Sequence, residues 1–115
     1  MKKLKLVINN DVNKIEKEQF FIKKELQCIL NLYAKMVSNG SWRDYSFSSG
    51  AREVSFDVYL RASEKPVLRI LKNFRPNYFN EKYLIKDKNG NILKKSESLN
   101  SLINKTSWNK LRMIK

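Results

Sequence analysis

The sequence contains no histidine and a single cysteine, Cys28. Without histidine, the commonest general base and metal ligand is missing, which excludes catalysis by a serine–histidine or cysteine–histidine pair. One cysteine forms neither an intramolecular disulfide nor a cysteine cluster for zinc, so we expect a reducing, cytoplasmic setting. Because no histidine can activate its thiol, we interpret Cys28 as a packing residue beside a helix face.

Glycine and proline are also scarce, with three and two residues. No glycine-rich phosphate loop and no nucleophile elbow is present, and no apolar run approaches the ~20 residues of a membrane span. We therefore expect a protein that is not an enzyme, with no catalytic residues, no metal, no cofactor and no membrane partner.

Most of the charged residues in the sequence are positive. Lys and Arg number 24 against 11 Asp and Glu, a formal net charge of +13. This balance favours a polyanionic partner such as RNA or a ribonucleoprotein. The alternative is compositional: Lys outnumbers Arg by 18 to 6, and Lys, Asn and Ile have AT-rich codons. In that case the charge reflects genome composition, and the partner is another protein or a second copy of the chain.

The length of 115 residues and the hydrophobic fraction of 42% fit one domain with its own core. Residues 1–19 are weakly patterned, and we expect a mobile or peripheral leader there. The domain itself is expected over 20–104, followed by a basic tail at 105–115. Within this tail, docking of Trp108 on the core is favoured over contact with RNA.

Apolar periodicity predicts an α+β fold: an N-terminal helix, an antiparallel meander of four to five strands and a C-terminal helix. The first helix is expected over about 22–38 and should end at Gly40. Glu25 is expected on its polar side, and Ser96 or Ser98 should cap the second helix. The predicted apolar face of the first helix comprises Ile22, Leu26, Ile29, Leu30, Tyr33 and Val37.

Alternating residues predict strands at 42–48 and 53–61, joined by a two-residue type II′ turn at Gly50-Ala51. Further strands are predicted at 67–72, 78–87 and 92–94. The last two flank Asn89-Gly90, a type I′ hairpin signal.

These turns predict a register that places Trp42 opposite Tyr59 and Asp44 opposite Asp57. The same logic places Tyr59 opposite Arg69 and leaves Arg43 on the helix-facing side. We expect Arg43 to form a partly buried ion pair with Glu64 that fixes the corner of the sheet. The predicted binding surface is the outer sheet face and its corner, built from Trp42, Asp44, Tyr59, Arg61, Glu64 and Arg69.

This surface has several interpretations. Aromatic and arginine side chains stack on bases and bind phosphates, and they also form hot spots of protein interfaces. The facing carboxylates of Asp44 and Asp57 could instead share a proton or hold a metal ion. Without any function, Arg61 and Arg69 would neutralise the two carboxylates while Trp42 covers Tyr59. We favour contact with RNA or a ribonucleoprotein, and a protein partner or homodimer is the alternative.

Two signatures support attention to this region. They read Gly40-x-Trp42-Arg43-Asp44-Tyr45 and Arg61-Ala62-Ser63-Glu64-x-Pro66. With Glu25-Leu26 before them and Gly90-x-Ile92-Leu93-Lys94 after them, the chain resembles a family of small bacterial proteins catalogued as a domain of unknown function. The resemblance implies one domain and a cytoplasmic setting, and it implies no activity.

Overall fold

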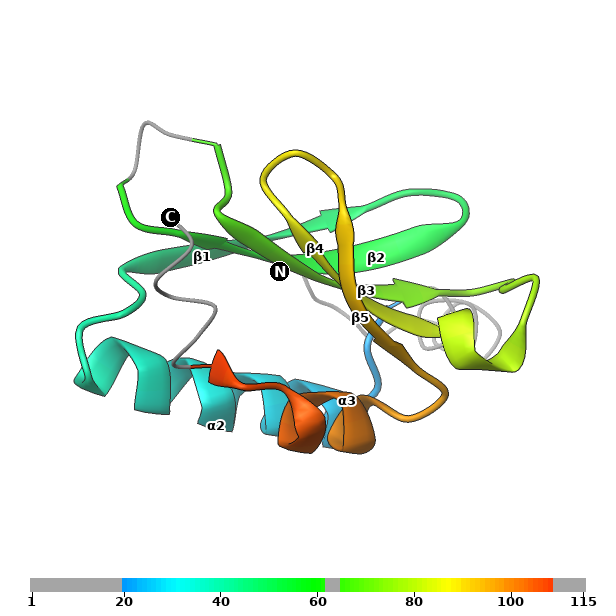
Figure 1. Cartoon of the computed structure of the whole chain (residues 1–115), viewed down its shortest axis with the longest axis horizontal. Helices are drawn as coiled ribbons and strands as arrows, with labels where there is room; N and C mark the ends of the chain where they lie inside the picture. Colours follow the sequence, from blue (N-terminus) through cyan, green and yellow to red (C-terminus); the bar gives the residue numbers. More distant parts are fainter. Residues whose placement is uncertain (1–19, 62–64, 109–115) are drawn as a thin grey trace, which may run out of the picture.

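The computed structural model describes residues 20–61 and 65–108 and confirms the α+β fold (Figure 1). One sheet of five antiparallel strands lies against two helices, which share one side of it. The helices are α2 (Lys23–Ser38) and α3 (Leu99–Lys105). The strands follow in chain order as β1 (Asp44–Ser49), β2 (Glu53–Tyr59), β3 (Leu68–Asn73), β4 (Tyr83–Asp87) and β5 (Ile92–Ser96), with a short 3-10 helix, η1 (Phe79–Glu81), before β4. The expected leader at 1–19 and the end of the expected tail lie outside the described residues.

Helix α2 occupies the predicted span but turns a different face to the sheet. Its buried residues are Glu25, Ile29, Leu32 and Met36. Ile22, Leu30 and Val37, which we expected in the core, are exposed. The expectation failed because it assigned Glu25 to solvent, whereas partners from β3 and β4 hold this carboxylate in the interface.

The end of α2 follows the prediction. Asn39 is the C-cap residue, and Gly40 follows with a φ of 82°. This left-handed conformation suits glycine and turns the chain toward the sheet. Both Ser41 and Trp42 then donate their backbone amides to the Met36 carbonyl oxygen, at 2.8 and 3.2 Å.

Trp42 consequently lies in the core and not on the outer sheet face where we had placed it. Its exposed fraction is 6%, and its ring packs against Tyr33 and Trp108. The prediction extended the strand back to residue 42, but β1 begins at Asp44. Because Trp42 is tied to the end of α2, it does not follow the alternation of the strand.

Both predicted registers on β2 are wrong by two residues. Phe47 pairs with Phe56, and Asp57 lies opposite Ser46 on one side and Arg69 on the other. The β1–β2 connection is longer than a two-residue turn, since the Gly50 amide donates to the Glu53 carbonyl at 2.8 Å. A shift of two keeps the side chains of β2 and β3 on their predicted faces, so the division of these strands into core and outer faces survives.

The β4–β5 hairpin also has a longer connection than predicted. The Gly90 amide donates to the Asp87 carbonyl, and the Asp87 amide donates to the Asn91 carbonyl, both at 3.0 Å. Gly90 has a φ of 87°, typical of a three-residue hairpin loop with a glycine bulge. The Asp87 carboxylate accepts from the Asn91 and Asn89 amides, and the Asn91 hydrogen bond is the main reason that the pKa of Asp87 is lowered.

The C-terminal segment has the structure that we predicted from the sequence. Ser98 caps α3 by accepting from the Ser101 amide at 3.3 Å. Trp108 docks on the core, with its ring edge-to-face against Trp42 and its indole N–H donating to the Ile103 carbonyl at 3.0 Å. The preference for docking is therefore confirmed. The fully buried side chains of the core between sheet and helices include Ile29, Met36, Val54, Phe56, Val58, Ile70, Ile85 and Leu102.

We expect Trp42→Ala to lower the free energy of unfolding by about 3–5 kcal/mol, because it removes a buried ring and leaves a cavity beside Trp108. The exposed neighbour Arg43 provides the matched control, and Arg43→Ala should change stability by less than about 0.5 kcal/mol. Urea unfolding measures both. A loss below about 1 kcal/mol for Trp42→Ala would contradict the buried placement.

Candidate functional site

The outer face of the sheet, the side away from α2 and α3, is the surface that the sequence singled out. Strand alternation places on it the side chains of Asp44, Ser46, Ser48, Glu53, Ser55, Asp57, Tyr59, Arg69, Leu71, Asn73, Leu84, Lys86 and Lys95. Leu71 and Leu84 face each other across β3 and β4 and are buried, so the face has an apolar centre of its own. Its accessible part is polar and charged.

Asp57 is the most constrained polar residue of this face. Its carboxylate accepts from the Ser48 hydroxyl at 2.6 Å, from the Ser55 hydroxyl at 2.7 Å and from Arg69 Nε at 3.0 Å. Arg69 also donates from Nη2 to Ser55 Oγ at 3.0 Å. The Asp57 side chain is 3% exposed and that of Arg69 is 35% exposed. The Asp57 carboxylate is therefore buried, and Arg69 neutralises it. This agrees with the interpretation in which arginine side chains of this face neutralise its acids and have no further function.

The interpretation of Asp44 and Asp57 as a carboxylate pair is wrong. Asp44 lies opposite Tyr59 at the exposed start of β1, two residues along from the partner of Asp57. Its carboxylate accepts from the Tyr45 amide at 2.8 Å. The longer β1–β2 connection therefore removes the direct opposition of the two acids on which a shared proton or metal ion depended.

The remaining predicted site residues lie apart from one another. Tyr59 is half-buried on the outer face and shares a hydrogen bond of 3.0 Å with the Ser46 hydroxyl. Arg61 is exposed just beyond β2, and Glu64 lies outside the described residues. Arg43 is exposed and not half-buried as we expected. Its backbone amide donates to the Tyr59 carbonyl at 2.9 Å.

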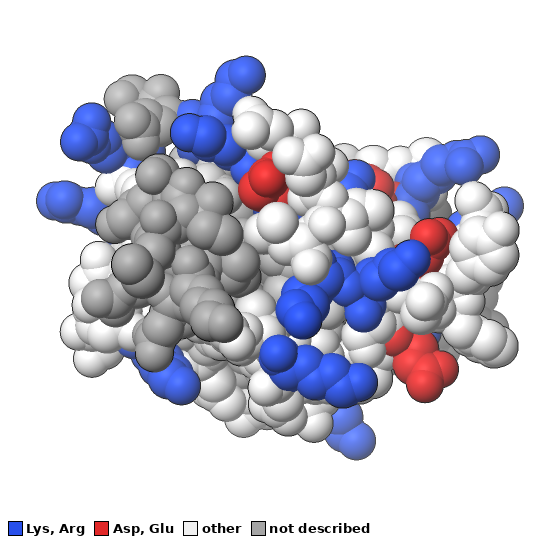
Figure 2. All heavy atoms as spheres, viewed as in Figure 1, with Lys and Arg blue, Asp and Glu red and all other residues white. Residues whose placement is uncertain are grey.

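Cations remain accessible on the outer face after these corrections. Arg69 and Lys86 lie directly opposite each other on β3 and β4. Lys95 lies on the next strand, opposite Leu84, with a side chain that is 47% exposed. Figure 2 shows Lys and Arg side chains, with acidic side chains beside them, over the region where Figure 1 draws β5. We call Arg61, Arg69, Lys86 and Lys95 the cationic face.

An exposed aromatic pair was missed in the sequence. Tyr78 and Phe79 precede β4 and are 68% and 83% exposed, the largest fractions among the large hydrophobic side chains of the described residues. We had assigned both to a strand, where their apolar character needed no further explanation. The 3-10 helix η1 begins at Phe79 instead, and it turns both rings outward.

A buried ionic network was missed as well. Glu25 Oε1 accepts from Lys72 Nζ and from the Ile22 amide, both at 2.8 Å, and Glu25 Oε2 accepts from the Tyr83 hydroxyl. Lys72 Nζ also donates to the Phe20 carbonyl at 3.0 Å. Burial, followed by the hydrogen bond to Glu25, raises the pKa of Tyr83. We interpret this network as the structural clamp between α2 and the sheet, since its polar atoms satisfy one another.

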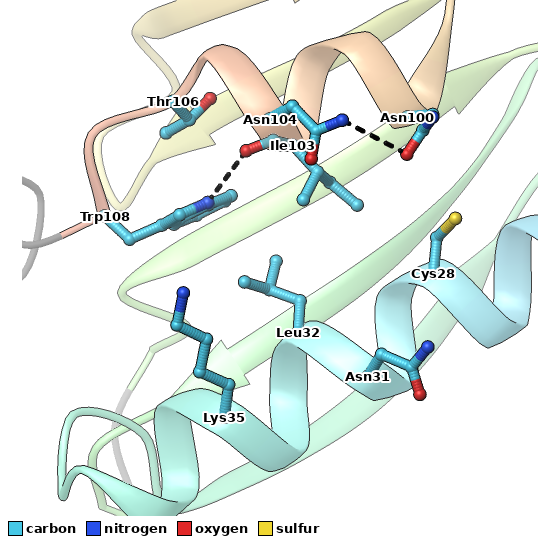
Figure 3. A pocket seen from close by; sticks show the side chains of 9 residues that line it. All are labelled: Cys28, Asn31, Leu32, Lys35, Asn100, Ile103, Asn104, Thr106 and Trp108. Atoms are coloured by element: carbon cyan, nitrogen blue, oxygen red, sulfur yellow. Dashed lines mark hydrogen bonds between the residues drawn. The ribbon is translucent and has the colours of Figure 1, made fainter.

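Two adjacent cavities follow the seam between α2 and α3. The larger has a volume of about 400 Å³ and is lined by Asn31, Asn104 and Trp108 among others (Figure 3). The smaller, of about 290 Å³, reaches Glu25 and Tyr83. Cys28 lines both, so its thiol is half-buried at their junction. The walls contain side-chain amides, lysines and the Cys28 thiol, and the smaller cavity also has the carboxylates of Glu25 and Glu97, so they can bind a polar group.

Within 20–61 and 65–108, no group of three or more His, Cys, Asp or Glu side chains is arranged to hold a metal ion. In that part of the chain, no helix has the length and apolar character needed to cross a membrane.

Fold and site together define a small α+β domain with one covered and one polar sheet face. The chain belongs to the family described as "Protein of unknown function (DUF2794)", whose model matches residues 19–103. The searches of curated proteins and of solved structures found no match.

We expect Lys72→Met to lower the free energy of unfolding by about 3–5 kcal/mol, because it leaves the buried Glu25 carboxylate without its cation. Lys23→Met, at an exposed position on α2, is the control and should stay within about 0.5 kcal/mol of the parent chain. Chemical denaturation compares the two. Equal stabilities of both variants would show that the clamp does not hold α2.

The clamp also predicts a dependence on alkaline pH. The pKa of Tyr83 is raised above the ordinary value of 10.0, so above about pH 10 the unfolded chain releases this proton and the folded chain keeps it. This residue therefore makes folding less favourable as the pH rises. The stability difference between the parent chain and Tyr83→Phe should narrow from about pH 9 to about pH 11.

The exposed Tyr78 supplies the control for this measurement, because Tyr78→Phe removes a hydroxyl that packs against nothing in the clamp. Urea unfolding at several pH values gives the difference for each variant. If the difference in the free energy of unfolding between the parent chain and Tyr83→Phe stays constant with pH, the Tyr83 hydroxyl does not have a raised pKa in the folded chain.

Proposed function

We propose that this chain is a small non-catalytic module that binds RNA, or RNA within a ribonucleoprotein, through its cationic face. The observation that carries the proposal is the direct pairing of Arg69 with Lys86 on adjacent strands, with Lys95 on β5 opposite Leu84, two residues along β4 from Lys86. Cations on neighbouring strands offer several phosphate contacts to one backbone, and each contact releases counterions.

The neutralisation of Asp57 matters for this function. An exposed carboxylate at this position would repel phosphates, but Asp57 is buried and is paired with Arg69 and two serines. Arg69 remains about one-third exposed, so it can contact a phosphate while it holds the acid. The net charge of +13 adds a long-range attraction for any polyanion.

The alternative is a protein partner or a second copy of this chain on the same side of the molecule. Ile92 on the edge strand β5 favours it, because this side chain is 51% exposed opposite Lys86. Such an interface depends on apolar burial and has little dependence on salt. A reducing cytoplasm is the compartment that we propose for either function, given the free thiol of Cys28.

Salt dependence tests the RNA proposal. Lys86→Gln/Lys95→Gln removes two cations from the proposed face, whereas Arg69 is unsuitable because its loss would leave Asp57 unpaired. The double variant should weaken binding of single-stranded RNA and lower the salt slope of the logarithm of the affinity by about 1.4, the value for two phosphate contacts. Fluorescence anisotropy at salt concentrations from about 50 to about 300 mM measures this slope.

The control is Lys23→Gln/Lys35→Gln on α2, which removes the same charge from the helical layer. This control variant should show the same dependence of RNA affinity on salt as the parent chain. If both double variants lose the same affinity, the charge acts as a nonspecific background, and the proposed face is wrong.

A further inference from the structure

The connection between β3 and β4 presents two aromatic rings to solvent. Phe79 is 83% exposed and Tyr78 is 68% exposed, so neither contributes its ring to the core. A phenylalanine this exposed forgoes the stabilisation of burial and adds a risk of aggregation. The described part of the fold gives these rings no packing role, which makes them candidates for contact with a partner.

Hydrogen bonds hold this connection firmly to the sheet. At its start, the Phe74 amide donates to the Arg52 carbonyl at 2.9 Å. At its end, Asn73 donates from Nδ2 to the Glu81 carbonyl and from its backbone amide to the Lys82 carbonyl, both at 2.7 Å. Rings on an anchored connection lose little conformational entropy when they bind, which favours recognition.

Two exposed cations lie close to the rings in the sequence. Arg75 and Lys82, both exposed, flank the pair along the chain. Glu81 is the nearby acid, and it forms an ion pair of 3.7 Å with Lys95. Because Lys95 belongs to the cationic face, this ion pair joins the connection that carries the rings to one member of that face.

We propose that Tyr78 and Phe79 stack on unpaired bases, so that the cationic face binds single-stranded RNA in preference to duplex RNA. This inference rests on the proposed function and names its ligand class. Aromatic rings beside cations are the arrangement that binds single strands without a sequence code, since every base has a π-face. A duplex keeps its bases stacked inside, and it can use the cations but not the rings.

The charge around the rings decides against a protein partner here. An apolar hot spot of a protein interface is typically depleted in lysine at its centre, whereas Arg75 and Lys82 flank this pair along the chain and Lys95 pairs with Glu81 of the same connection. A ligand that offers both flat apolar rings and negative charge satisfies both kinds of side chain at once, and a single-stranded nucleic acid is such a ligand.

The test uses the full chain and three changes at one exposed position. Phe79→Leu keeps an apolar side chain and removes the π-face, Phe79→Ala removes both, and Phe79→Tyr keeps the ring. The probes are a fluorescein-labelled oligouridylate of about 12 nucleotides and a duplex RNA of equal length. Loss of one stacked base corresponds to roughly 5- to 150-fold in affinity, so we expect Phe79→Leu to bind the single strand about tenfold more weakly.

Phe79→Tyr should bind the single strand as the parent chain does, and none of the three changes should affect duplex binding by more than about twofold. Leu30→Ala, an exposed apolar change on α2, is the control and should leave both affinities unchanged. Retained affinity in Phe79→Leu would overturn the inference, because an aliphatic side chain would then suffice.

The failure of this inference is distinguishable from that of the proposed function. Equal, salt-dependent binding of both probes, unchanged by Phe79→Leu, would refute stacking and leave RNA binding by the cationic face intact. The absence of salt-dependent binding to either probe would refute both.

Discussion

The buried carboxylate of Glu25 is the interaction on which the rest of the structure depends. It joins three places that are distant in sequence: the start of α2, β3 through Lys72 and β4 through Tyr83. Because these contacts fix the rotation of α2 about its own axis, they determine which helical stripe meets the sheet. A charged pair in such an interface is costly to desolvate, and its hydrogen bonds to Tyr83 and to backbone groups offset that cost.

With α2 held by the clamp, one face of the sheet packs against the helices and the other face stays accessible. On the helical side, Trp42 and Trp108 complete an apolar layer that closes over the end of α2. On the other side, the burial of Asp57 beneath Arg69 removes the one acid at the centre of that face, and cations remain accessible around it. Stability is thus concentrated in one layer, and the opposite surface is available for the recognition that we propose.

The spans of both helices and the alternation within the strands could be predicted because they depend on local periodicity, and the strand order followed from the short connections. Registers could not, since the β1–β2 connection is longer than the turn that Gly50-Ala51 suggested. Trp42 was misplaced because its backbone is bonded to Met36 of α2, a contact that strand alternation does not include. Glu25 and Lys72 were missed because their pairing spans 47 residues of sequence, and Phe79 was missed because its exposure depends on where β4 begins.

The central claim is that RNA contacts the outer sheet face and the connection before β4. The most direct test is a titration of ¹⁵N-labelled protein with single-stranded RNA, followed by amide chemical shifts. The account predicts that the largest salt-sensitive shifts fall on Arg69, Lys86, Lys95 and on 78–79, while the amides of α2 stay in place. Largest shifts along the cavities between α2 and α3, near Cys28 and Trp108, would contradict it.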